Sequence, residues 1–155
     1  MALFFLLKGE KDMINSTAVS EQEVQAYGNV IFDKDQVRTR SSKCPRRGWL
    51  SHKENSAIFD ITKNGIYKIY YNANITTELA GNEIGLQLTA DGEPIEGSKS
   101  VDYPFDNNFY GAISATVLIT VNLNCPYEKV SIALENISED VIKIKDANLI
   151  IDRVG

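Results

Sequence analysis

Apolar residues occupy every second position in several segments of the chain. The clearest segment spans 66–76, in which apolar residues at the odd positions alternate with mostly polar residues at the even ones. A second long segment, 111–123, is apolar at its odd positions and uncharged at its even positions. Because side chains alternate between the two faces of a strand, a period of two predicts β-strands. Shorter runs predict further strands at 24–32, 57–61, 85–90, 130–134 and 147–151.

The segments between these runs carry turn signals. Asp91-Gly92 separates two extended runs, which predicts a hairpin, and Pro94 places the returning strand at a sheet edge. No amphipathic helix of convincing length is present. About eight short strands at regular spacing predict an all-β sandwich or barrel. We expect residues 1–22, which have mixed composition, to form an N-terminal leader or extension and 23–155 to form the domain.

Composition supports the same fold class. The chain has 155 residues, a length typical of one domain, and 17 Ile, 10 Val and 8 Thr favour sheet. No apolar run approaches the length of about 18 residues that a membrane-spanning helix needs. The apolar run 2–7 is too short for a signal peptide and no positive residue precedes it, so we expect an apolar strand or plug there.

Two motifs resemble a known superfamily. Phe59, five residues and then Gly65-Ile66-Tyr67-Lys68-Ile69-Tyr70-Tyr71 is similar to the core motif of the complement-q globular head, whose jelly roll is shared with tumour necrosis factor. Gly85-Leu86-Gln87-Leu88 with Asp91-Gly92 resembles a hairpin of bacterial collagen-tip domains of this superfamily. The chain departs from the pattern at Ile69, usually aromatic, and at His52, where an apolar residue is expected and nearby Leu50 is the alternative occupant.

The resemblance implies a two-sheet antiparallel jelly-roll sandwich that assembles as a compact homotrimer. One sheet, with the strands 66–76, 111–123 and 141–153, would face the threefold axis. This would explain the uncharged second face of 111–123. The alternative is that these side chains lie beneath a loop of the same chain. The residues predicted for the trimer interface are Tyr70, Ser114, Thr116, Leu118 and Ile150.

Charge is distributed unevenly along the chain. The formal net charge is −5, which argues against general nucleic-acid binding. However, residues 38–53 hold six basic residues and no acid, and the rest of the chain carries a net charge of −11. Such a loop favours an anionic ligand, with Trp49 available for stacking, whereas simple solvation of the charges is the alternative. The basic loop comprises Arg38, Arg40, Lys43, Arg46, Arg47, Trp49 and Lys53.

Catalytic and metal-binding signals are weak. Cys44 and His52 are the only thiol–imidazole pair in one loop, without a third orienting group, and no nucleophile-elbow, zinc or phosphate-loop motif is present. We therefore expect no enzyme and no cofactor. Oxygen-bearing residues in the loop 101–110 are of the type that calcium takes, although turn formation selects the same residues. They are Asp102, Asp106, Asn107 and Asn108.

Three functions remain, in order of preference. The first is a non-enzymatic trimeric adhesion module of a phage particle, spore coat or bacterial surface, binding a receptor or an anionic cell-surface glycan. The second is a cytokine-like ligand of a receptor, and the third an enzyme using Cys44 and His52. The aromatic residues of the loop 101–110 form a second candidate surface, with sealing of the trimer base or the sandwich edge as the alternative. They are Tyr103, Phe105, Phe109 and Tyr110.

Overall fold

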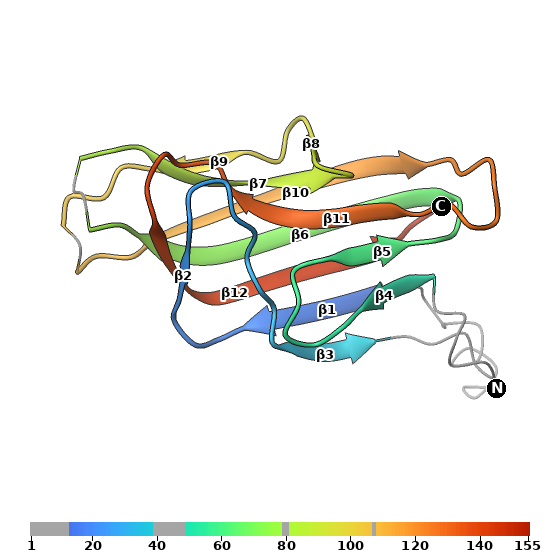
Figure 1. Cartoon of the computed structure of the whole chain (residues 1–155), viewed down its shortest axis with the longest axis horizontal. Helices are drawn as coiled ribbons and strands as arrows, with labels where there is room; N and C mark the ends of the chain where they lie inside the picture. The colour runs from blue at the N-terminus through green and yellow to red at the C-terminus, as the bar shows by residue number, and fades with distance from the viewer. Residues whose placement is uncertain (1–12, 39–48, 79–80, 107) are drawn as a thin grey trace, which may run out of the picture.

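Two antiparallel sheets pack face to face to form a sandwich (Figure 1). The computed structural model describes residues 13–38, 49–78, 81–106 and 108–155. Within these ranges there is no helix, and hence none that is long and apolar enough to cross a membrane. The expected all-β, two-sheet antiparallel jelly-roll sandwich is confirmed.

Sheet A contains the two longest strands at its centre. Its order is β10 (Gly111–Val121), β6 (Gly65–Thr76), β12 (Ile142–Arg153), β1 (Met13–Ala18) and β3 (Lys34–Arg38), and β2 (Gln22–Val24) pairs with β12. Sheet B has the order β4 (Leu50–His52), β5 (Phe59–Ile61), β11 (Val130–Asn136), β7 (Ile84–Ala90) and β8 (Glu93–Pro94), and β9 (Ser100–Asp102) pairs with β7.

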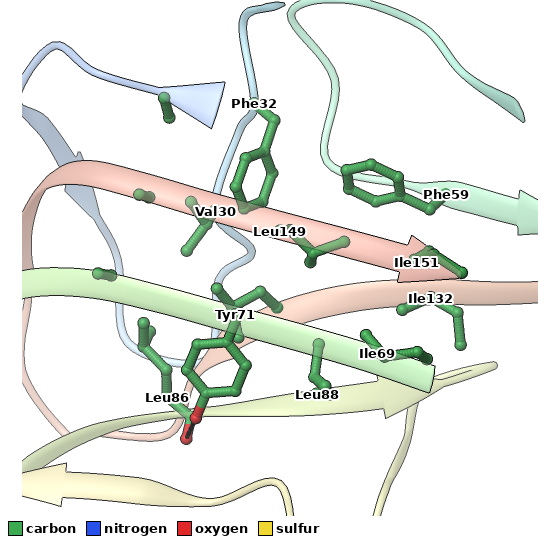
Figure 2. Close-up of a cluster of buried hydrophobic side chains, with 14 of the residues drawn as sticks. Val30, Phe32, Phe59, Ile69, Tyr71, Leu86, Leu88, Ile132, Leu149 and Ile151 are labelled. Atoms are coloured by element: carbon green, nitrogen blue, oxygen red, sulfur yellow. Dashed lines mark hydrogen bonds between the residues drawn. The ribbon is translucent and has the colours of Figure 1, made fainter. Parts of the chain in front are cut away.

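The core lies between the sheets and is built from the alternating positions that the sequence marks. Along β6 the side chains of Tyr67, Ile69 and Tyr71 are buried, as predicted, while their neighbours point outward. Figure 2 shows Ile69 and Tyr71 among apolar side chains of both sheets, including Leu88 and Ile132 of sheet B. Full burial of an aliphatic or aromatic side chain stabilises the fold by roughly 1.5–3 kcal/mol.

The hairpin between β7 and β8 forms as predicted. Asp91 and Gly92 both have positive φ, 51° and 83°, which is the backbone of a type I′ turn. Pro94 lies in the edge strand β8, where its missing N–H removes no ladder bond to a further strand.

The segment 24–32 is not the single strand that its alternation predicts. The strand β2 ends at Val24, and Tyr27 then adopts a left-handed backbone with φ 61°. Beyond this turn the chain makes only isolated bridges, from Asn29 to Glu135 and from Phe32 to Ser56. The turn breaks the strand but keeps the inward phase, so Phe32 is still buried in the core.

Part of the expected leader belongs to the sandwich. Residues 13–18 form β1, which pairs with β12 on one side and β3 on the other. The inward positions of β1 are Ile14, Ser16 and Ala18, all buried. Only the first of these is a large apolar residue, and this is why the alternation gave no strand signal in the sequence.

A β-bulge changes the phase of β12. The register with β6 shifts between Lys145 and Asn148, and Asp146 in between has φ 51°. Before the bulge the even positions Ile142 and Ile144 face the core, and after it the odd positions do, starting with Ala147. The bulge therefore joins two runs of opposite phase into one strand.

Tyr71 ties the two sheets together with a hydrogen-bonded hydroxyl. Its OH lies 2.6 Å from the carbonyl oxygen of Ser98 and 3.1 Å from that of Leu86, and donates its hydrogen to this pair. Burial raises the pKa of the Tyr71 hydroxyl above its usual range. The phenol therefore remains a neutral donor at the pH at which an exposed tyrosine begins to ionise.

We predict that Tyr71→Phe lowers the free energy of unfolding by about 1–3 kcal/mol, because two buried carbonyls lose a donor. Urea unfolding followed by circular dichroism measures this change. The matched control is Tyr103→Phe, which removes an exposed hydroxyl bonded to Glu83 and should leave the unfolding midpoint unchanged. An equal midpoint for both variants would contradict the bridging role of Tyr71.

Candidate functional site

The outward face of sheet A is an almost uncharged surface across three adjacent strands. The register places Thr116 opposite Tyr70, and Tyr70 opposite Ile150. In the next row Ser114 lies opposite Asn72, whose Nδ2 donates a 2.9 Å hydrogen bond to the hydroxyl of Tyr70. Leu118 extends the surface along β10, with 65% of its area exposed. The five residues predicted from the strand phase therefore share one face, here named the outer face of sheet A.

Several polar atoms on this face lack partners. The side-chain oxygens Oδ1 of Asn15, Asn148 and Asp152 are buried and have no hydrogen-bond partner among the described residues. Buried acceptors in native proteins nearly always have a donor.

The ends of the basic loop lie at the edges of both sheets. The strand β3 ends at Arg38 in sheet A, and β4 begins at Leu50 in sheet B. Of the residues predicted to bind an anionic ligand, Arg40, Lys43, Arg46 and Arg47 lie outside the described residues, as does the side chain of Arg38. Trp49 and Lys53 remain to define the site.

Trp49 is already engaged with a cation of its own chain. The Nζ of Lys63 lies 3.6 Å from the centre of the Trp49 ring. This cation–π contact occupies one face of the indole and adds a lysine that the sequence analysis did not include. The sequence gives no signal for the contact between Lys63 and Trp49, because only the antiparallel pairing of β4 with β5 brings these two residues together.

A cavity of about 570 Å³ lies beside the described part of the basic loop. It is lined by residues from β4, from the turn after β4 and from β5. Exposed Lys53 borders it, and Asp60 on the opposite side is paired with Lys129 at 3.4 Å. The lining residues are Ser51, His52, Lys53, Ser56, Ile58 and Asp60.

His52, which the enzyme hypothesis pairs with Cys44, is a buried residue of the core. Its ring stacks on Phe59 with the ring centres 4.1 Å apart and an angle of 9° between the planes. Leu50 is also buried, so both residues of β4 that compete for the apolar position point into the sandwich. At the position where the motif has an apolar residue, the buried imidazole of His52 therefore occupies the core.

Both ring nitrogens of His52 have oxygen partners. Nδ1 lies 2.6 Å from Oδ1 of Asp35, and Nε2 lies 2.8 Å from the carbonyl oxygen of Ser56. The hydroxyl of Ser16 donates to the same carboxylate oxygen and lies 3.4 Å from Nδ1. Neither Asp35 nor Ser16 could be singled out in the sequence, since both are ordinary polar residues at strand positions.

This Ser–His–Asp group does not have the geometry of a catalytic triad. In a triad the aspartate bonds Nδ1 and the nucleophile bonds Nε2, whereas Ser16 and Asp35 both approach Nδ1 and a carbonyl occupies Nε2. The side chains of His52 and Asp35 are almost fully removed from solvent. Cys44, the nucleophile of the enzyme hypothesis, lies outside the described residues.

The aromatic loop after β9 is exposed. Phe105 has 96% of its area exposed, and Phe109 and Tyr103 are also exposed. The hydroxyl of Tyr103 donates a 2.5 Å hydrogen bond to Glu83, which raises the pKa of Tyr103. Lys145 lies over the ring of Tyr110 at 4.2 Å. In this single chain the loop does not seal the sandwich edge.

The calcium candidates in this loop have turn contacts. The carboxylate of Asp106 accepts a 3.1 Å hydrogen bond from the backbone N–H of Asn108, and Asp102 is packed against Gly111. Asn107 lies outside the described residues. Among the residues that the structure describes, no three His, Cys, Asp or Glu side chains are grouped so that they could hold a metal ion.

Two adjoining cavities at the end of the sandwich carry an acidic surface that sequence reasoning missed. Asp140 lines both of them, one of about 310 Å³ with Glu23 and Glu78 and one of about 360 Å³ with Glu83 and Glu139. The carboxylates come from β2, from the connection between β6 and β7 and from the connection between β11 and β12, so no run of acidic residues in the sequence indicates this surface.

Known structures share this fold at low sequence identity. No family model and no curated protein matches the sequence. Murine APRIL superposes with a TM-score of 0.64 at 11% identity, covering 92% of this chain and 98% of that one. Eiger TNF from S. frugiperda has a TM-score of 0.64 at 12% identity and covers 94% of both chains.

A third solved structure has a similar fold. The globular domain of the zebrafish complement 1qA protein superposes with a TM-score of 0.59 at 11% identity, covering 88% of this chain and 94% of that one. Its similarity extends over nearly the whole described sandwich. The chain thus shares its jelly-roll fold with these three proteins, which is the fold that the resemblance of its sequence motifs implies.

Proposed function

We propose that this chain is a non-enzymatic interaction module that assembles as a homotrimer through the outer face of sheet A. The observation that supports the proposal most is the uncharged centre of this face, where the rows through Tyr70 and Asn72 carry no charge and Lys68 and Asp152 face each other one row away. Interface cores are depleted of charged residues, because uncharged groups cost less to remove from water. Closed cyclic assemblies are the usual form of soluble homo-oligomers.

The details of the face agree with an interface between subunits. Leu118 and Tyr70 supply apolar contact area, and Ile150 lies beside Tyr70 in the central row. The hydroxyls of Ser114 and Thr116 are exposed donors that a neighbouring subunit meets. Donors of this kind satisfy the unpaired oxygens of Asn15 and Asn148 once those amides turn outward.

We predict a mass three times the 17.3 kDa of one chain in light scattering at micromolar concentration. Leu118→Asp buries a charge in each interface and should convert the protein to monomer with its circular dichroism spectrum unchanged. Tyr127→Asp, at a 92% exposed position outside sheet A, is the matched control and should remain trimeric. A monomeric wild-type protein would rule out the assembly and the interface residues together.

For the ligand, we propose an anionic polymer or cell-surface glycan bound by the basic loop. The loop concentrates six positive charges on a chain that is otherwise strongly acidic. Lys63 over Trp49 and exposed Lys53 beside the 570 Å³ cavity extend the cationic surface into the described structure. Three copies in a trimer multiply a weak single-site affinity, which suits a repetitive polymer. Such a module fits a bacterial surface, a spore coat or a phage particle.

The basic-loop proposal predicts that Arg46→Glu combined with Arg47→Glu abolishes retention on an anionic polymer such as dextran sulfate, while the melting temperature stays unchanged. The two substitutions lower the charge of each subunit by four units, which weakens its attraction to the anionic polymer. Lys99→Glu with Lys143→Glu changes the net charge equally at sites away from the loop and should retain most of the binding. If the arginine variant binds as well as wild type, the exposed aromatic loop at Phe105 becomes the ligand surface instead.

A further inference from the structure

We propose that Asp35 and His52 form a buried ion pair, here called the clasp, that positions the cationic edge of the ligand site. The cationic edge comprises Lys53 and the contact of Lys63 with Trp49. The proposal rests on the anion-binding role of that edge. The clasp joins sheet A to sheet B between the edge strands β3 and β4. It consists of an imidazolium and a carboxylate, and its two residues act as positioning residues that do not touch the ligand themselves.

The oxygen atoms around the ring fix the positions of the hydrogens. A carbonyl oxygen only accepts hydrogen bonds, so Nε2 of His52 carries the hydrogen that points to Ser56. The partner of Nδ1 is a carboxylate oxygen that also accepts the hydroxyl of Ser16. A carboxylate oxygen that accepts from one donor can accept from a second, and this is the role left for it toward Nδ1. The shared proton therefore lies on Nδ1, and the ring is an imidazolium.

The pair is removed from water. The side chain of His52 is 0% exposed and that of Asp35 is 6% exposed. Among the described residues, Oε2 of Glu54 in the turn after β4 accepts a 3.2 Å hydrogen bond from the backbone N–H of Asp35. A buried ion pair adds little net stability over apolar side chains of the same size, but it specifies one geometry because each charge must meet its partner.

The elements held by the clasp are those that carry the cationic edge. Asp35 lies in β3 and Ser16 in β1, both in sheet A, while His52 ends β4 in sheet B. The carbonyl of Ser56 accepts from both Nε2 of His52 and the backbone N–H of Phe32. The clasp thus fixes β3 and β4 against each other, and with them the turn after β4 that carries Lys53.

The charge state is tested by ¹⁵N NMR of the imidazole in the full-length protein at pH 7. We expect both ring nitrogens to carry hydrogen in the folded protein. Asp35→Asn removes the counter-ion and should return the ring to a form with one bare nitrogen. A wild-type ring with one bare nitrogen at pH 7 would overturn the imidazolium assignment.

The positioning role is tested with Asp35→Asn combined with His52→Leu. The amide that replaces the Asp35 carboxylate still accepts from Ser16, and the leucine that replaces His52 still packs on Phe59. The double variant should therefore melt close to wild type and above Asp35→Asn alone. We expect it to bind long-chain inorganic polyphosphate about tenfold more weakly than wild type. The control is Glu78→Gln with Lys143→Gln, which removes another ion pair, 3.4 Å apart, at the acidic cavities and should bind like wild type.

The outcomes separate this proposal from the function on which it rests. Equal polyphosphate affinity of wild type and the Asp35/His52 double variant overturns the positioning role and leaves the anion-binding function standing. A wild-type protein that does not bind polyphosphate or dextran sulfate overturns the anion-binding function and with it the positioning role. The NMR result then decides separately whether the buried charged pair exists.

Discussion

The packing of β6 across the sandwich is the interaction on which the rest of the structure depends. Its inward side chains, Tyr67, Ile69 and Tyr71, fill the core, and the hydroxyl of Tyr71 reaches the carbonyl of Leu86 in the facing sheet and that of Ser98 in the segment between β8 and β9. Because the side chains of a strand alternate, fixing these residues inward also fixes Tyr70 and Asn72 outward. A shift of one residue would exchange the two sets, so the same constraint produces both the core and the uncharged outer face.

Much of this could be predicted from the sequence, because long strands with one apolar face carry a strong period of two. The strands β6 and β10 and the hairpin at Asp91-Gly92 were identified in this way. Prediction failed where local backbone geometry interrupts the period. Tyr27 turns the chain inside an alternating run, and the bulge at Asp146 joins two runs of opposite phase. Alternation indicates which side chains face the core, but it does not show whether an alternating run forms one continuous strand or is interrupted by a turn or a bulge.

The candidate site was less predictable because its parts come from distant segments. The strand phase placed Leu118 and Ile150 on one face, since each strand carries its own signal. His52, in contrast, looked like a departure from the motif, and only the fold shows that a carboxylate 17 residues earlier accompanies it into the core. The acidic cavities around Asp140 likewise combine residues from several connections. Polar clusters built through tertiary contacts leave no spacing in the sequence.

Two polar bridges cross the sandwich, and their different chemistry reflects different tasks. Tyr71 is a neutral donor whose burial keeps it neutral, so its bridge is insensitive to solution conditions and suits the core. The bridge from Asp35 to His52 lies where the edge strand β3 of sheet A meets the edge strand β4 of sheet B. An apolar contact there would hold the strands together without selecting one alignment, whereas a charged pair with directed hydrogen bonds selects one. A surface that must present several cations to a polymer in a constant arrangement gains from such selection, and in a trimer each gain in alignment is repeated at three sites.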